Sequence, residues 1–102
     1  MMAATGSKIW MDGRMVDFAD AHVHVLSHTL HYGVGVFEGI RGYATPQGPA
    51  IFRLRDHVAR LIQSARLYHM KIPYSAEAIE RAILETQAAN AVLPSYLRPI
   101  AY

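Results

Sequence analysis

The sequence contains no cysteine and no long apolar run, and each absence excludes a class of protein. Without cysteine there is no disulfide scaffold, no thiolate nucleophile and no cysteine-ligated zinc. The longest uninterrupted apolar run has four residues, whereas a membrane-spanning helix needs about 20. We therefore expect no membrane partner. Because nothing in the composition requires an oxidising compartment, we also expect a cytoplasmic location.

Positive charge and lysine are scarce as well. The formal net charge is only +2 over 102 residues, and the arginines are scattered from Arg14 to Arg98, so we expect no nucleic-acid partner. The chain has no phosphate-binding glycine loop, no Gly-x-Ser-x-Gly elbow and no His-Glu-x-x-His zinc motif. The two lysines, Lys8 and Lys71, lie where burial would not lower the pKa for covalent catalysis.

The order of elements predicts one α+β domain. Asp12-Gly13 between apolar pairs indicates a hairpin, and alternation favours strands over 22–25, 34–44 and 96–102, with a returning strand at 50–53. An apolar stripe of helical period covers 54–68, and Ser75 is placed to cap a second helix. We expect a mostly antiparallel sheet with the two main helices packed on one side. Residues 1–7 read as a flexible tail and 8–102 as the domain.

The strand over 34–44 has two unlike faces. One carries Glu38 among apolar residues, namely Val34, Val36 and Ile40. The other carries two glycines among larger side chains, namely Gly35, Phe37, Gly39, Arg41 and Tyr43. Glycine weakens a strand, so this face indicates a place where something approaches the backbone closely. A ligand wall and a strand packed tightly on a neighbour both remain open.

Two arginines carry competing interpretations. Arg60 lies off the apolar stripe, four residues after Asp56, where an exposed ion pair and a phosphate clamp are both possible. Arg98 shares one strand face with Tyr96, and a phenol beside a guanidinium suits a carboxylate. An ordinary edge-strand pair would look the same.

Histidines cluster in one short segment. His22, His24, His28 and His31 share faces of a predicted strand and a short helix. No carboxylate or cysteine stands at ligand spacing beside them, so we expect no metal.

The joined motifs resemble a known family. His24-Val25-Leu26-Ser27-His28-Thr29-Leu30-His31-Tyr32-Gly33, followed by Val36-Phe37-Glu38-Gly39-Ile40-Arg41, is similar to the branched-chain amino-acid aminotransferases, which are fold-type IV pyridoxal-phosphate enzymes. Ile9-Trp10 with Asp12-Gly13, Phe52-Arg53 to Arg60-Leu61 with Ser64-Ala65, and Tyr96-Leu97-Arg98-Pro99 agree with the same family. The resemblance therefore covers nearly the whole chain.

The resemblance implies roles for individual residues. Arg60 matches the arginine that holds the phosphate of pyridoxal 5'-phosphate. Substrate-binding positions are matched by Tyr32, Phe37, Gly39, Tyr96 and Arg98, with Tyr32 acting across a dimer interface and Arg98 reading the acidic side chain of glutamate. Glu38 and Arg41 are expected to give structural support. The implied partners are amino acids and 2-oxo acids, and a second copy in a homodimer or higher homo-oligomer.

The family's Schiff-base lysine has no counterpart in the sequence, since neither Lys8 nor Lys71 matches it. We therefore expect this chain to be the amino-terminal small domain of a two-domain transaminase, with no catalytic residue of its own and no activity alone. The expected parent reaction moves the amino group of leucine, isoleucine or valine to 2-oxoglutarate. Alternatives are a non-catalytic binding or dimerisation module, and a D-amino acid aminotransferase or aminodeoxychorismate lyase on the same fold.

Overall fold

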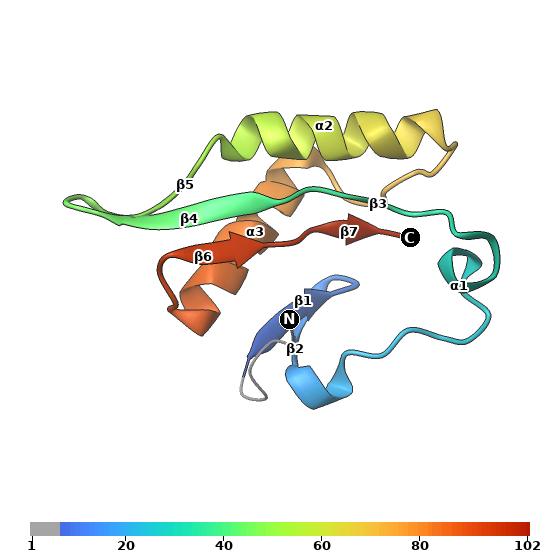
Figure 1. The fold of residues 1–102 in the computed structure, drawn as a ribbon, viewed down its shortest axis with the longest axis horizontal. Coiled ribbons are helices and arrows are strands. Elements are labelled where there is room, and N and C mark those ends of the chain that lie inside the picture. Colours follow the sequence, from blue (N-terminus) through green and yellow to red (C-terminus); the bar gives the residue numbers. More distant parts are fainter. Residues whose placement is uncertain (1–6) are drawn as a thin grey trace.

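Two long helices lie against a ribbon of antiparallel strands in the computed structural model, which describes residues 7–102 (Figure 1). The expected tail over 1–7 thus lies almost wholly outside the described residues. In chain order the elements are β1 (Lys8–Met11), β2 (Arg14–Asp17), a 3-10 turn (Phe18–Asp20), α1 (His28–Tyr32), β3 (Val36–Phe37), β4 (Ile40–Thr45), β5 (Gly48–Ile51), α2 (Leu54–Leu67), α3 (Ala76–Asn90), β6 (Ser95–Leu97) and β7 (Ile100–Ala101).

The predicted hairpin is confirmed. β1 and β2 pair antiparallel, with Trp10 opposite Met15, and the two turn residues, Asp12 and Gly13, have φ of 50° and 97°. Positive φ at both central positions gives a two-residue turn whose twist matches the strands. The hairpin is tied to the end of α3, because the Asn90 amide accepts from Lys8 N at 2.8 Å and donates to Lys8 O at 2.9 Å.

The strands predicted over 34–44 and 96–102 are both present, and both are interrupted at the same level. β4 pairs with β6 and β3 pairs with β7, all antiparallel, with Ile40 opposite Leu97 and Phe37 opposite Ile100. Between these pairings the Glu38 N–H still donates to Pro99 O at 3.1 Å. Pro99 has no N–H to return, so the two pairings form one antiparallel ribbon with a break at residues 38–39 and 98–99.

The helices cover one face of this ribbon, as expected for the α+β class. α2 begins after Arg53, and α3 begins after its N-cap Ser75, whose hydroxyl accepts from Ala78 N at 3.1 Å. This cap confirms the role predicted for Ser75. The inner sides of the ribbon and helices share one core made of Val36, Ile40, Val58, Leu61, Ala65, Ile79 and Ile83. None of the helices within residues 7–102 is long and apolar enough to cross a membrane.

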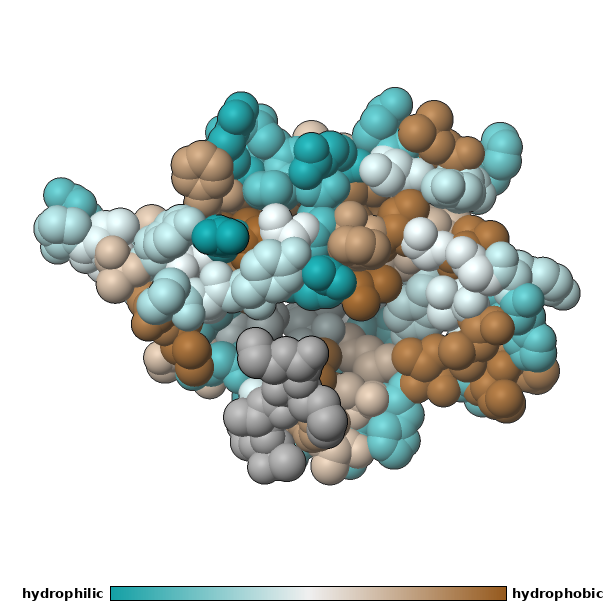
Figure 2. Space-filling model, viewed as in Figure 1, coloured by the Kyte–Doolittle hydropathy of each residue, from teal (hydrophilic) through white to brown (hydrophobic). Residues whose placement is uncertain are grey.

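The prediction of a strand over 22–25 is wrong. Residues 21–27 form a loop instead, because no strand within residues 7–102 pairs with them and Val23 and Val25 are exposed. Local hydrogen bonds hold the loop: Leu26 N donates to His24 Nδ1 at 3.0 Å, and the His31 ring meets Val25 O at 2.8 Å. Figure 2 shows hydrophobic residues gathered over the end of the molecule where α1 lies.

Candidate functional site

The break in the ribbon brings four predicted substrate residues together. Phe37 and Gly39 flank Glu38 on one strand, while Tyr96 and Arg98 lie opposite on the other. The guanidinium carbon of Arg98 lies 4.2 Å from the centre of the Phe37 ring and 5.3 Å from that of Tyr96. Arg98 Nη2 also donates to the Tyr96 hydroxyl at 3.1 Å. The arginine is thus held between two aromatic rings, an arrangement that favours a cation.

Gly39 is required for this arrangement. A Cβ atom at residue 39 would lie 2.7 Å from Tyr96 Cζ and still closer to its hydroxyl. The close approach predicted for the glycine-bearing face is therefore real at Gly39, and the approaching group is the phenol of Tyr96. Phe37, Tyr96 and Arg98 remain exposed, so the ring of Phe37 and the polar atoms of Tyr96 and Arg98 are available to a ligand.

On the opposite face of the same stretch, Glu38 is buried among apolar residues and is only 5% exposed. Arg60 Nε donates to Glu38 Oε1 at 3.1 Å and to Oε2 at 2.9 Å, and Arg60 Nη2 donates to Oε1 at 2.7 Å. The ring of His57 adds a contact from Nδ1 to Oε1 at 2.8 Å. The hydrogen bonds from Arg60 lower the pKa of Glu38, outweighing burial, and His57 acts in the same direction.

Arg60 therefore does not form the exposed pair with Asp56 that helical spacing offered. Arg53 Nε donates to Asp56 Oδ2 at 2.8 Å, and Arg60 turns toward the sheet. Its side chain is nonetheless 67% exposed, so one edge of the guanidinium contacts Glu38 while the other faces solvent. Pairing with Glu38 raises the pKa of Arg60, and the guanidinium is positively charged at neutral pH, as arginine always is.

Sequence reasoning missed how important Glu38 and His57 are. The sequence predicts only structural support for Glu38 and assigns no role to His57. The signal was present, however. Alternation placed Glu38 on the apolar face of its strand, and a buried carboxylate requires charged or hydrogen-bonding partners. His57 and Arg60, three residues apart, lie on one side of α2 and supply them.

Tyr32 lies apart from the other predicted residues. It ends α1, is 73% exposed and packs edge-on against the ring of His28, with ring centres 5.5 Å apart. Figure 1 shows α1 at the opposite end of the ribbon from β6, which carries Tyr96. Within residues 7–102, no three histidine or acidic side chains lie close enough to hold a metal ion.

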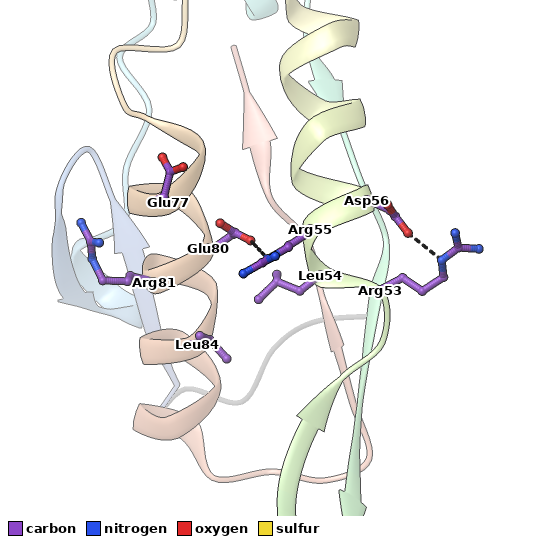
Figure 3. Close-up of a pocket in the computed structure, with 8 residues that line it drawn as sticks. All are labelled: Arg53, Leu54, Arg55, Asp56, Glu77, Glu80, Arg81 and Leu84. Carbon is purple, nitrogen blue, oxygen red and sulfur yellow. Dashed lines mark hydrogen bonds and ion pairs between the residues drawn. The ribbon is translucent and has the colours of Figure 1, made fainter.

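A separate groove runs between the first turn of α2 and the first half of α3 (Figure 3). Arg55 crosses it to Glu80 at 3.5 Å, and the lining is mostly charged: Arg53, Leu54, Arg55, Asp56, Glu77, Glu80, Arg81 and Leu84. None of the residues predicted to bind cofactor or substrate lines it, so the candidate site is the ribbon break and not this groove.

Comparison with known proteins defines the class. Residues 35–102 match the amino-transferase class IV family, and the chain belongs to it. The chain is 50% identical over 101 residues to a branched-chain-amino-acid aminotransferase of Pseudomonas aeruginosa, covering 99% of this chain and 33% of that protein. For the enzyme of Escherichia coli K12 the identity is 43% over 94 residues, covering 92% and 30%. The recognised resemblance is thereby confirmed.

Solved structures agree in fold. A branched-chain amino acid aminotransferase of Thermoproteus uzoniensis with norvaline has a TM-score of 0.86 at 48% identity, covering 94% of this chain and 33% of that chain. The corresponding enzyme of Escherichia coli has a TM-score of 0.88 at 42% identity, covering 93% and 31%. This confirms the small α+β domain of a fold-type IV aminotransferase. The chain spans about a third of the length of these relatives.

A third solved structure contains a cofactor derivative. It is a branched-chain amino acid aminotransferase complexed with N-(5'-phosphopyridoxyl)-L-glutamate, and it superposes with a TM-score of 0.92 at 48% identity, covering 95% of this chain and 33% of that chain. The family to which this chain belongs therefore includes enzymes that bind pyridoxal-phosphate derivatives.

Proposed function

We propose that this chain forms part of a branched-chain amino-acid aminotransferase. The reaction moves the amino group of leucine, isoleucine or valine to 2-oxoglutarate. One observation carries the proposal: residues 37–39 lie between two groups of functional side chains. On the outer face, Phe37 packs against Arg98, which bonds Tyr96. On the inner face, Glu38 accepts hydrogen bonds from Arg60. Phe37 of the substrate cluster and Glu38, the carboxylate that holds Arg60 of α2, are thus adjacent residues.

Arg60 fits the phosphate of pyridoxal 5'-phosphate. Its guanidinium is charged, exposed on one side and held on the other, and its fixed fork of donors matches phosphate oxygens. A relative that is 48% identical was solved with pyridoxamine 5'-phosphate, which supports a cofactor of this type. When bound, pyridoxal phosphate supplies an electron sink for carbanion chemistry.

The aromatic cluster suits both kinds of substrate. Phe37 offers an apolar surface for a branched side chain, while Arg98 and the Tyr96 hydroxyl offer two donors for the side-chain carboxylate of glutamate or 2-oxoglutarate. Related enzymes were solved with 4-methylvaleric acid and with norvaline, both of which carry an apolar chain. Gly39 contributes by leaving space for the Tyr96 phenol.

Covalent attachment of the cofactor requires a lysine that we assign to a further domain. Lys8 forms an ion pair with Asp17 on the β1–β2 hairpin, and Lys71 follows α2 at the surface, so neither belongs to the candidate site. We also propose that the full-length protein forms a homodimer or higher homo-oligomer, in which Tyr32 on the exposed α1 contributes to the neighbouring subunit's site.

The cytoplasmic location stays a prediction.

The test is an assay of the full-length protein with pyridoxal phosphate. We expect amino transfer from L-leucine, L-isoleucine and L-valine to 2-oxoglutarate, and none from D-leucine. Transfer from D-amino acids, or pyridoxal-phosphate binding with no transfer from branched-chain substrates, would overturn the proposal. The relatives matched here are named branched-chain aminotransferases, so the binding-module and D-amino acid alternatives are not favoured.

A further inference from the structure

We propose that Glu38 is a positioning residue for the cofactor phosphate: it aims the guanidinium of Arg60 and thereby sets how tightly the phosphate is held. This inference rests on the proposed function, because it takes Arg60 as the phosphate ligand. It adds a residue that touches no ligand and acts entirely through Arg60.

The contacts define an orientation as well as a charge pair. Arg60 Nε and Nη2 both donate to Glu38, at 2.9 Å to Oε2 and 2.7 Å to Oε1. Two parallel contacts between a planar guanidinium and a planar carboxylate hold the two groups in one plane. The donors on the far side of the guanidinium then point in a fixed direction. Within residues 7–102, Nη1 makes no hydrogen bond, so it is available to a phosphate oxygen.

Glu38 is buried and held by several contacts, whereas Arg60 has no other hydrogen-bond partner within residues 7–102. The Glu38 backbone N–H is bonded to Pro99 O at 3.1 Å, and its neighbours in the inner row, Val36 and Ile40, are buried. His57 Nδ1 also contacts Oε1 at 2.8 Å. Arg60 is 67% exposed, and an exposed arginine with no partner samples many rotamers. In the described part of the chain, Glu38 supplies all the hydrogen bonds that the Arg60 side chain makes.

An alternative is that Glu38 only stabilises the fold. The two roles differ in their dependence on the phosphate group. A positioning role affects pyridoxal 5'-phosphate and leaves pyridoxal, which lacks the phosphate, unaffected. A purely structural role disturbs the whole site and weakens both ligands.

The experiment measures the affinity of the full-length apoenzyme for pyridoxal 5'-phosphate and for pyridoxal. Glu38→Gln keeps the size of the side chain and removes its charge, so we expect the phosphate ligand to bind roughly tenfold more weakly or worse, with pyridoxal unchanged. Asp56→Asn is the matched control, since it removes a carboxylate one turn from Arg60 that pairs with Arg53 instead. It should change neither affinity. Equal weakening of both ligands by Glu38→Gln, or no weakening of either, would overturn the proposal.

If Glu38→Gln does not fold, Arg60→Lys tests whether the orientation of the Arg60 guanidinium affects phosphate affinity. The lysine keeps the positive charge at an exposed position but cannot form the two-point contact, so phosphate-dependent affinity should fall about tenfold while pyridoxal binds as before. Wild-type affinity in Arg60→Lys would show that orientation is irrelevant. Arg60→Ala distinguishes a failure of the phosphate assignment of Arg60 from a failure of the positioning role of Glu38. If it leaves pyridoxal-phosphate affinity intact, the assignment of Arg60 itself fails. If Arg60→Ala weakens binding and Glu38→Gln does not, only the positioning role fails.

Discussion

The phenol of Tyr96 occupies the space that a side chain on Gly39 would need. Tyr96 Cζ lies 2.7 Å from the position of a Cβ atom at residue 39, and the hydroxyl lies closer still. That hydroxyl accepts from Arg98, so the size of residue 39 controls where a phenol and a guanidinium are presented together.

Gly39→Ala should therefore impair recognition of the acidic substrate. The methyl group forces Tyr96 away and breaks its hydrogen bond to Arg98, so we expect the KM for 2-oxoglutarate in the full-length enzyme to rise about tenfold. Pyridoxal-phosphate affinity should not change, because Arg60 lies on the other face. Gly35→Ala is the control: its Cβ would meet Thr29 Oγ1 at 3.2 Å, away from Tyr96. A wild-type KM in Gly39→Ala would refute this role.

Phe37→Ala should alter substrate preference with little effect on folding, since the ring is exposed. The variant loses the apolar surface offered to branched side chains. It also loses the ring that stacks on Arg98, a contact worth about 0.5–1 kcal/mol at an exposed site. We expect kcat/KM for leucine to fall more than kcat/KM for glutamate, as measured by steady-state kinetics with each amino donor. An equal fall for the two donors would contradict the assignment of Phe37 to the side-chain pocket.

The Glu38–Arg60 pair should make stability depend on pH in the acidic range. Hydrogen bonds from Arg60 hold the pKa of Glu38 below its ordinary value of 4.5, so the unfolded chain binds more protons than the folded one between the two pKa values. The contribution of this pair to the free energy of unfolding is therefore fully present above pH 4.5 and is lost as the pH falls through the pKa of Glu38 in the folded protein. Denaturant titrations at a series of pH values measure this, and Glu38→Gln should flatten that part of the profile. The same slope in Glu38→Gln would assign the effect to other carboxyl groups.

Gly42→Ala should destabilise the fold itself. A Cβ at residue 42 would lie 2.5 Å from Ser95 Oγ and 3.0 Å from Gln87 Oε1, where the buried Gln87 bonds both Ser95 and Val92 O. We expect a loss of about 1–3 kcal/mol in the free energy of unfolding, measured by chemical denaturation. Ala44→Ser, at an exposed position on the same strand, should stay within about 0.5 kcal/mol of wild type. Comparable stability of Gly42→Ala and Ala44→Ser would show that Gln87 and Ser95 can move to make room for the methyl group with no loss in the free energy of unfolding.

Local sequence patterns predicted the elements whose partners are close in the chain. The Asp12-Gly13 turn, the Ser75 cap and the apolar stripe of α2 each depend on neighbours within a few residues, and all are confirmed. Alternation over 22–25 failed because a strand also needs a partner, and periodicity does not report whether one is present.

The same distinction applies to the candidate site. Residue spacing offered Asp56 as the partner of Arg60, four residues away, but the partner is Glu38, 22 positions earlier on the buried face of the ribbon. A tertiary contact of this kind depends on how α2 packs against β3 and β4. The family resemblance supplied the role proposed for Arg60, while only the structure showed that Glu38 holds its guanidinium.

Whether Arg60 holds the phosphate of pyridoxal 5'-phosphate is decided by the dissociation constant of that cofactor. In the full-length enzyme, Arg60→Ala should weaken binding of pyridoxal 5'-phosphate at least about tenfold. The control, Arg55→Ala, removes a side chain on the same helix that is 93% exposed and pairs with Glu80, and it should bind like wild type. Equal dissociation constants for Arg60→Ala and Arg55→Ala would show that Arg60 does not hold the phosphate.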